Sequence, residues 1–215
     1  QSLWFSFFLQ GWAILFVPIL TLLILPLVDQ YVGLWVENLE PDIEESRLFW
    51  YRLITLIWAP IQFITLFGIL ALAISADMTL LEKIGLFCAI GVLTGTIGIN
   101  YAHELMHKSG KLERWLADSL LAMVLYSHFR SEHLLVHHIH VGTPKDPVTA
   151  RYNESFYSFF NRVLVQCPIS AFKAETQKLW RKRLPASHIS NPFYIYFSAQ
   201  LFMIVLSILI GGFLG

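Results

Sequence analysis

Four apolar runs, each about as long as a bilayer is thick, limit what this chain can fold into. A membrane-spanning helix needs about 20 consecutive apolar residues. Runs of about this length occupy residues 3–28, 53–76, 84–107 and 192–215. Backbone polar groups inside lipid must be hydrogen-bonded within the protein. The sequence therefore predicts an all-α fold, a polytopic bundle of transmembrane helices.

The composition agrees with a membrane protein. The chain is 56% hydrophobic and 14% charged, whereas soluble domains carry about 25% charged residues. This difference excludes an ordinary soluble domain. We expect membrane lipids around the helices and no nucleic-acid partner.

The basic residues predict the orientation of the chain. Of the 15 lysines and arginines, all except Arg47, Arg52 and Lys83 lie between Lys108 and Arg183. The positive-inside rule assigns such a stretch to the cytoplasm, so a histidine-rich region at 103–190 is expected there. Counting back, residues 29–52 are cytoplasmic and residues 77–83 form an outer turn. The apolar stretch 115–126 is too short to span, and we expect a re-entrant or interfacial helix.

Two smaller features concern the extent and the packing of the chain. Residue 1 is Gln, and the last residues still belong to an apolar run. We therefore expect residues 1–215 to be one partial integral-membrane domain of a longer protein. The Gly91-x-x-x-Gly95 pattern allows close approach of helix backbones, and we interpret it as tight packing only.

The histidines form the chemically most distinctive pattern. All eight except His188 lie between His103 and His140. His103 and His107 are four residues apart, so on a helix they share a face. The same spacing recurs later, with a further histidine one step around the helix. Ionisable residues at a membrane border are usually functional. The predicted metal ligands are His103, His107, His133, His137 and His138.

Nearby acidic residues are expected to support these ligands. A metal-bound imidazole normally donates its other N–H group to an acceptor. We expect Glu104, Glu132 and Asp146 to be such acceptors. His128 and His140 are further candidates near the site, interpreted first as a structural and a surface histidine. No catalytic residue separate from the metal ligands is predicted.

The residue types leave several metals and several protein classes open. No cysteine accompanies the histidines, which excludes thiolate zinc and iron–sulfur sites, but imidazole suits zinc, copper, iron and nickel. By itself, His103-Glu-Leu-Met-His107 fits an intramembrane zinc metalloprotease with glutamate as general base. The three further histidines exceed what one tetrahedral zinc can use. A metal transporter is disfavoured, because it would need ionisable groups deep within its helices, and residues 3–28 and 53–76 contain none.

Three segments carry a family resemblance: Asn100-Tyr-Ala-His-Glu-Leu-Met-His-Lys108, Glu132-His-Leu-Leu-Val-His-His138 and Val141-Gly-Thr-Pro-Lys-Asp-Pro147. Together they resemble the membrane-bound alkane 1-monooxygenases, which belong with xylene monooxygenase and the fatty acid desaturases. The Thr-Pro-x-Asp-Pro turn, with Arg151 and Asn153-Glu-Ser155 beyond it, is similar to the alkane and xylene branch. The resemblance extends from about residue 26 to about residue 175.

The resemblance implies a histidine-ligated non-haem di-iron centre, with two irons per full-length chain and O2 as co-substrate. It implies terminal hydroxylation of alkanes, or of similar hydrophobic hydrocarbon chains, on the cytoplasmic side of a bacterial inner membrane. Electrons would come from a rubredoxin-type donor. Desaturase-type oxidation stays open as an alternative. The basic surface at 173–183 would suit an acidic donor or anionic lipid headgroups.

Two departures from the family pattern stand out. Val136 occupies a position where the family often has a small residue. The later histidine boxes of the family have no counterpart in these 215 residues, which therefore carry about half of the expected ligand set. The preferred chain length, alkane versus aromatic methyl substrates and the oligomeric state lie beyond the sequence.

Overall fold

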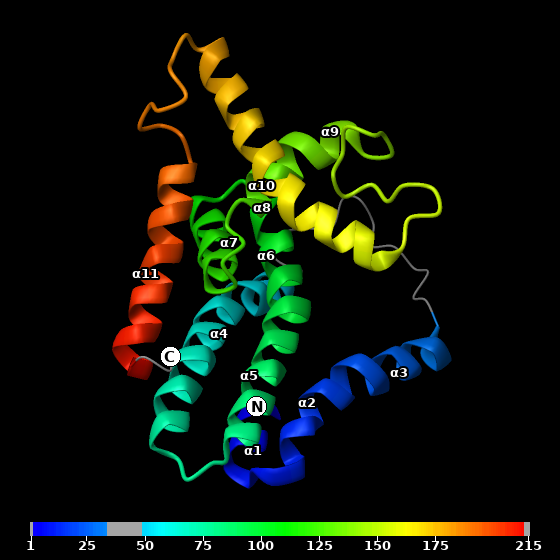
Figure 1. Ribbon diagram of the computed structural model, residues 1–215, viewed down its shortest axis with the longest axis vertical. Coiled ribbons are helices and arrows are strands. Elements are labelled where there is room, and N and C mark those ends of the chain that lie inside the picture. The colour runs from blue at the N-terminus through cyan, green and yellow to red at the C-terminus, as the bar shows by residue number, and fades with distance from the viewer. Residues whose placement is uncertain (1, 34–48, 213–215) are drawn as a thin grey trace. The chain divides into compact units, whose positions relative to one another are not determined.

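The computed structural model describes residues 2–33 and 49–212, which form helices and no strand (Figure 1). The all-α prediction is therefore confirmed. Within these described ranges, four helices are long and apolar enough to cross a membrane: Gly11–Val32, Phe49–Ser75, Leu80–Met106 and Phe193–Gly211. The chain is thus an integral membrane protein. Most of the loop predicted to be cytoplasmic, residues 34–48, lies outside the described residues.

The described elements are helices or helical turns throughout. In chain order they are α1 (Ser2–Leu9), η1 (Gly11–Leu15), α2 (Phe16–Ile19), η2 (Leu20–Ile24), α3 (Leu25–Val32), α4 (Phe49–Ser75), α5 (Leu80–Leu93), η4 (Thr94–Gly98), α6 (Ile99–Met106), α7 (Lys111–Met123), α8 (Phe129–Glu132), η5 (His133–His137), α9 (His138–His140), α10 (Phe156–Arg181) and α11 (Phe193–Gly211). Of these, η2, η4 and η5 are π-helical turns.

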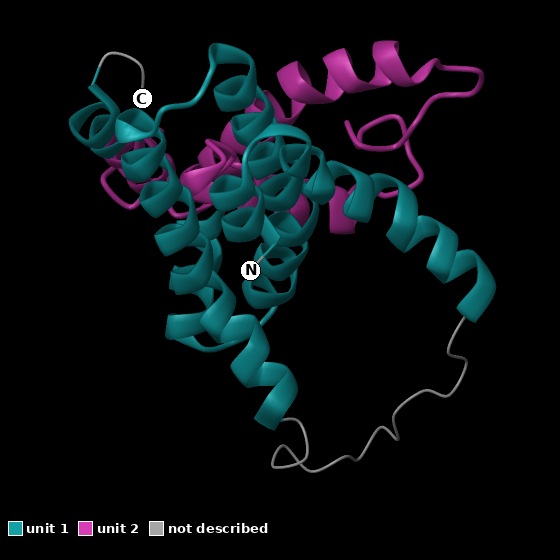
Figure 2. Ribbon diagram, turned by 90° about the horizontal axis from the view of Figure 1, so that it is seen from below, with its two compact units in different colours: residues 1–120, 204–215 teal, residues 121–203 magenta. Residues whose placement is uncertain are grey.

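The chain divides into two compact units, coloured separately in Figure 2. Unit 1 comprises residues 1–120 and 204–215, and unit 2 comprises residues 121–203. Each unit is described by itself below.

The first apolar run of unit 1 is interrupted near its start. The sequence predicts one helix over 3–28, but α1 ends at Leu9 and a second helical stretch begins at Gly11. Both Gln10 and Gly11 have φ of 53°, a left-handed conformation that a continuous α-helix does not allow. The Gly11 N–H donates to Glu82 Oε1 at 2.8 Å. This bond satisfies a backbone group that the interruption leaves without a helical partner.

Glu82 also fixes the beginning of α5. Its Oε2 accepts hydrogen bonds from the backbone N–H and the hydroxyl of Thr79, both at 2.8 Å. The Thr79 hydroxyl in turn accepts from the Glu82 N–H at 3.3 Å, which completes a capping box. One carboxylate therefore holds the starts of two helices together.

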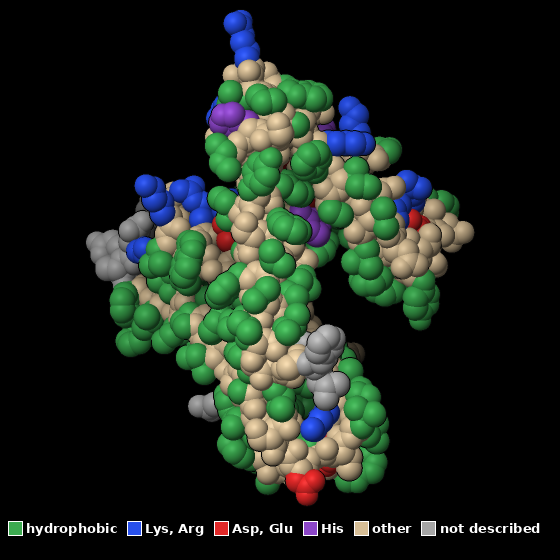
Figure 3. Space-filling view, turned by 60° about the vertical axis from the view of Figure 1, so that its left-hand side comes forward, with side chains coloured by type: hydrophobic (Ala, Val, Ile, Leu, Met, Phe, Trp, Pro, Cys, Tyr) green, Lys and Arg blue, Asp and Glu red, His purple; other side chains and the backbone are tan. Residues whose placement is uncertain are grey.

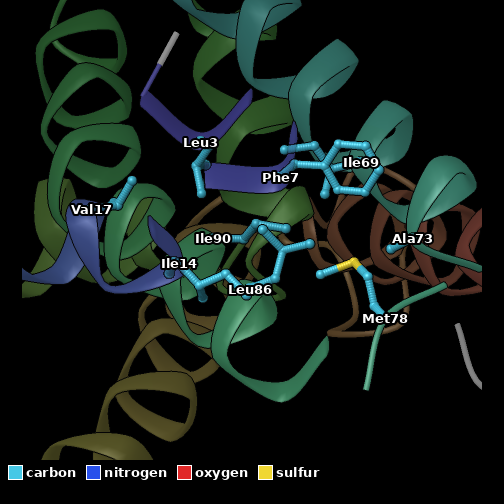
Figure 4. Packing of buried hydrophobic residues seen from close by; sticks show 10 residues of the cluster. Leu3, Phe7, Ile14, Val17, Ile69, Ala73, Met78, Leu86 and Ile90 are labelled. Carbon is cyan, nitrogen blue, oxygen red and sulfur yellow. The ribbon is translucent and has the colours of Figure 1, made fainter. Parts of the chain in front are cut away.

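The core of unit 1 lies where α1, η1, α2, α4 and α5 meet (Figure 4). Leu3 and Phe7 of α1 pack there with Ile69 of α4 and with Leu86 and Ile90 of α5. In lipid, such contacts stabilise through close packing, because lipid tails are as apolar as the side chains. Hydrophobic side chains are spread over the visible helix surfaces in Figure 3, as expected of helices that face lipid.

The stretch from Leu80 to Met106 is one continuous span with a π-turn at η4. The Gly91 and Gly95 interpretation was wrong, because a Cβ added at either position would meet nothing within 4 Å in the described part of the unit. Close packing occurs at Gly98, where an added Cβ would overlap the Gln62 amide. Gln62 is itself held by the Trp58 Nε1–H, which donates to its Oε1 at 2.9 Å.

The short helix after the first histidine pair is anchored to α4. It begins at Lys111, four residues before the predicted start at 115, and its Glu113 is buried. The Arg52 guanidinium donates to Glu113 Oε1 through Nη2 at 2.5 Å and through Nε at 3.1 Å. The ion pair fixes the direction of α7 immediately after the helix that carries His103 and His107.

Unit 2 is built around α10, which packs against α8 and η5. The Ser131 hydroxyl of α8 donates to Glu175 Oε1 of α10 at 2.7 Å and lies 2.8 Å from the Tyr196 hydroxyl of α11. These buried bonds connect three helices at one point. They support the segment that carries the second group of histidines.

The loop between α9 and α10, residues 141–155, is held by Arg162 of α10. Its Nε and Nη2 donate to the two carboxylate oxygens of Glu154 at 2.8 and 2.6 Å. Its Nη1 donates to the Pro147 carbonyl at 2.5 Å, and Nη2 also donates to the Thr149 carbonyl at 3.2 Å. The bonds from Arg162, followed by the Arg151 backbone N–H, lower the pKa of Glu154 to about 2.

We predict that Gly98→Ala lowers the free energy of unfolding by about 1–3 kcal/mol, because the added methyl group must displace the Gln62 amide. Gly91→Ala is the matched control in the same span, where the space is open. It should be neutral or stabilising by up to about 1 kcal/mol, since alanine favours the helix. Unfolding of the detergent-solubilised protein measures both, and equal effects would contradict the packing at Gly98.

We predict that Glu154→Gln lowers stability at neutral pH and removes part of its acid dependence. The folded-state pKa of Glu154, about 2, lies below its ordinary value of 4.5. The contribution of the Glu154 carboxylate to the free energy of unfolding is therefore full above about pH 4.5 and is lost as the pH falls toward 2. Thermal unfolding of parent and variant across this window should converge at the acid end. A constant difference would mean that the carboxylate titrates alike in the folded and unfolded chains.

Candidate metal centre

The first histidine pair lies at the end of the third long span. His103 is in α6, and His107 follows immediately after the helix as its C-cap. Their Nε2 atoms are 3.3 Å apart and their rings are nearly perpendicular, at 76°. The four-residue spacing thus directs both imidazoles to one side, as predicted. Glu104 Oε1 is 4.0 Å from His103 Nδ1, which is ion-pair range but too long for a hydrogen bond.

The second group lies in unit 2, where a π-turn changes the expected pairing. The sequence predicts His133 and His137 as the aligned pair, with His138 one step around the helix. In the structure η5 runs from His133 to His137, so its turn is wider than an α-helical one. His138 consequently returns to the side of His133, and their Nε2 atoms are 3.0 Å apart. The rings of His133 and His137 still stack, with centroids 5.2 Å apart.

His137 is oriented by Asp146. The His137 Nδ1 lies 2.9 Å from Asp146 Oδ2, and Asp146 is only 1% exposed. Burial acts to raise the pKa of Asp146, but hydrogen bonds from Thr149, the Val148 N–H and His137 outweigh it and keep the pKa below its ordinary value. An ionised carboxylate only accepts hydrogen bonds, so the Nδ1 of His137 carries the proton. Its Nε2 is then the nitrogen with a lone pair for a metal.

Glu132 is buried without a hydrogen bond. The residue is 0% exposed, and neither carboxylate oxygen has a hydrogen-bonding partner among the described residues. Burial, followed by repulsion from Asp146, raises its pKa to about 7, while His137 opposes the shift. A buried carboxylate without donors is costly unless a positive charge is near. The predicted contact between Glu132 and the second N–H of a histidine is not formed in this structure.

The two additional histidine candidates have different surroundings. His128 precedes α8, and its Nε2 is buried with no hydrogen-bonding partner in the described residues. Burial lowers its pKa to about 4, so it is neutral at physiological pH, and its ring packs against Tyr126. His140 ends α9, and its carbonyl accepts from the Thr143 hydroxyl at 2.7 Å.

The donors in each unit suit a divalent transition metal. Two nitrogens bound about 2.1 Å from one ion are about 3.0 Å apart at a right angle and about 3.4 Å apart at the tetrahedral angle. The Nε2 pairs, at 3.3 Å for His103 and His107 and 3.0 Å for His133 and His138, fall in this range. The orphaned Glu132 carboxyl, next to His133 in the chain, becomes a source of negative charge when a nearby cation favours its ionised form. That the two groups share one centre stays a prediction.

Sequence reasoning missed two features that organise the second group. The π-turn at η5 leaves no signal in hydrophobic spacing, because it shifts one residue within a short helix. Arg162 lies 16 residues beyond Asp146 in the chain and was not considered, although it holds the loop that carries Asp146. The adjacent Glu154 was noted only as part of the family resemblance.

Comparison with known proteins agrees with the motifs. Residues 83–215 match the family model described as fatty acid desaturase. Alkane 1-monooxygenase 2 of Alcanivorax borkumensis is 34% identical over 178 residues, which are 81% of this chain and 47% of that protein. Alkane 1-monooxygenase 2 of Pseudomonas aeruginosa is 33% identical over 199 residues, 87% of this chain and 51% of the relative.

A third relative is named for xylene and toluene. The xylene/toluene monooxygenase hydroxylase component XylM of Pseudomonas putida is 32% identical over 133 residues, covering 61% of this chain and 36% of that protein. The chain thus spans about half the length of the alkane 1-monooxygenases that it matches. More than half of the chain fits the family model. The chain belongs to the fatty acid desaturase family, and within it is similar to the alkane 1-monooxygenases.

Proposed function

We propose that this chain is part of a membrane-bound alkane hydroxylase that oxidises the terminal carbon of alkanes, or of similar hydrocarbon chains, with O2. Its ligands to a non-haem di-iron centre on the cytoplasmic side are His103, His107, His133, His137 and His138. When bound, the two irons supply the oxidising chemistry. In the overall reaction one oxygen atom enters the C–H bond, and the other leaves as water after uptake of two electrons and two protons.

The paired imidazole nitrogens carry this proposal. Nε2 atoms separated by 3.3 Å in one unit and 3.0 Å in the other have the spacing of neighbouring ligands on a metal ion. Similarity to two proteins named alkane 1-monooxygenase, at 34% and 33% identity, points to the substrate class. Neither argument would identify the reaction by itself.

The residues around the ligands hold and orient them. Asp146 keeps the proton of His137 on Nδ1, which leaves Nε2 for the metal. The carboxylate of Glu132, buried and without hydrogen bonds from the described residues, gains a favourable electrostatic partner when a cation binds nearby. Both effects raise metal affinity without requiring these carboxylates to bind the ion directly.

The apolar spans offer a route for the substrate. Moving an alkane from water into an apolar environment is favourable by about 0.8 kcal/mol per CH2 group, so the substrate concentrates in the bilayer around the helices. Electrons would come from a rubredoxin-type donor. An acidic donor would suit the basic surface at the end of α10, where Lys178 and Arg181 lie in the last turn.

Desaturase-type oxidation is a second candidate, favoured by the description of the family model that matches residues 83–215. It would use the same ligands but remove two hydrogens from a chain instead of inserting oxygen. A zinc metalloprotease built on His103-Glu-Leu-Met-His107 would bind one zinc and would not depend on the histidines of unit 2. Metal content and product identity separate the three reactions.

We expect the complete protein, purified in detergent after expression with iron, to contain two irons per chain. Substituting alanine for any one of the five proposed ligands should abolish iron retention and O2-dependent formation of 1-alkanols from n-alkanes. Iron is measured by elemental analysis and products by gas chromatography with a reduced electron donor supplied. His188→Ala is the matched control, because His188 lies outside the ligand segments and its side chain accepts a local hydrogen bond from the Ser190 N–H.

The outcomes separate the candidates. One zinc per chain and no oxygen consumption would favour the protease. Alkenes or unsaturated acyl chains in place of alcohols would favour the desaturase reaction. A His133→Ala variant that kept full iron and full turnover would remove the second histidine group from the proposal.

A further inference from the structure

Asp146 owes its position to a loop that has little regular structure. The loop lies between α9 and α10, and its turns are closed by local bonds such as Asp146 N–H to Thr143 O at 3.1 Å. Two loop residues then donate to the Asp146 carboxylate: Val148 N–H to Oδ1 at 3.0 Å and the Thr149 hydroxyl to Oδ2 at 2.6 Å. The orientation of Asp146 therefore depends on where residues 147–149 lie.

Arg162 fixes these same residues from α10. It donates to the carbonyls of Pro147 and Thr149, which flank Val148 on either side. The Val148 N–H and the Thr149 hydroxyl, which donate to Asp146, thus come from the same three residues whose backbone the guanidinium binds. The contact sequence runs from Arg162 through residues 147–149 to Asp146 and from there to His137 Nδ1.

The geometry of Arg162 suits a fixed role. Its side chain is 10% exposed, and the Glu154 side chain that it binds with two parallel bonds is 8% exposed. Its guanidinium carbon also lies 5.4 Å from the centroid of the Phe159 ring, one helical turn before it. A planar fork of N–H donors can serve a carboxylate and two carbonyls at once, which a lysine ammonium cannot do in the same geometry.

We propose that Arg162 is a positioning residue for the metal centre, which acts on His137 through the loop residues 147–149 and Asp146. The inference rests on the proposed function in one respect, that His137 binds the metal. Arg162 itself touches neither metal nor substrate. Its loss leaves the Pro147 and Thr149 carbonyls without their donor, so the loop moves and Asp146 no longer holds the proton of His137 on Nδ1.

The test compares Arg162→Met, Arg162→Lys, Asp146→Asn and the Arg162→Met/Asp146→Asn double variant in the complete protein. Fe(II) affinity is measured by competition with a chelator, and thermal unfolding is measured on the metal-free proteins. Arg162→Met should weaken Fe(II) binding by about 10–100-fold, as loss of support for a histidine ligand typically does. Arg162→Lys should lie between Arg162→Met and the parent.

The matched control is Arg181→Met on the same helix. Arg181 is an exposed arginine in the last turn of α10. This substitution also removes a guanidinium from α10, but far along the helix from residues 147–149, so it should leave Fe(II) affinity unchanged. A general effect of charge on the helix would weaken binding in both variants and would overturn the proposal.

The double variant tests the route of action. If Arg162 acts through Asp146, the double variant should bind Fe(II) about as weakly as Asp146→Asn alone, because contacting groups in one network are not additive. Independent, multiplying losses would overturn the proposal, as would unchanged affinity in Arg162→Met. Full affinity in Arg162→Lys would overturn the role of the forked donor. If Arg162→Met does not fold, the lysine variant alone carries the comparison with Asp146→Asn.

A second measurement does not need iron. In metal-free protein labelled with nitrogen-15 at histidine, the parent should carry the His137 proton on Nδ1, whereas Arg162→Met should populate the Nε2-protonated form. An unchanged proton position in Arg162→Met would overturn the inference. If the parent itself bound no iron, the proposed function would fail, and this measurement would still decide whether Arg162 controls His137.

Discussion

The close approach of imidazole nitrogens is the constraint on which the histidine region depends. Two lone pairs cannot face each other at 3.0 Å, the distance between the Nε2 atoms of His133 and His138, without a proton or a cation between them. In the metal-free protein one ring must donate to the other. When a metal ion takes the place of that proton, both nitrogens can donate their lone pairs to the same ion. The helix geometry that brings the two rings together is therefore favourable only when a proton or a cation lies between their nitrogens.

The surroundings of the second histidine group reinforce this constraint. Glu132 and Asp146 are both buried, yet only Asp146 has hydrogen bonds that stabilise its charge. Two buried carboxylates repel each other, which raises the pKa of Glu132 after the larger effect of its burial. Two buried carboxylates are unfavourable by themselves, and a cation bound between or beside them makes the arrangement favourable. The same buried charges therefore affect both the stability of this region and its affinity for a cation.

The sequence predicts the spans and the histidine pairing within α6 because both follow from regular periods. Apolar runs give helix number, and a four-residue spacing gives a shared face. Prediction from the sequence fails where a helix departs from regular α-helical geometry. The interruption at Gln10 depends on a distant acceptor, Glu82, and the π-turn at η5 gives His138 a partner that ideal α-helical geometry assigns to another residue. The role of Arg162 was missed because, besides Glu154, it binds the backbone carbonyls of Pro147 and Thr149, and backbone groups carry no sequence information.

The bond from Gly11 to Glu82 also has a consequence for biogenesis. It joins the N-terminal ends of the spans Gly11–Val32 and Leu80–Met106, so these two helices must run in the same direction across the bilayer. Their C-terminal ends, at Val32 and at the first histidine pair, then emerge from the same leaflet. During insertion by the translocon, a third helix that entered the wrong way round would leave Glu82 on the opposite surface. The bond between Gly11 and Glu82 can therefore form only when both spans cross the bilayer in the same direction.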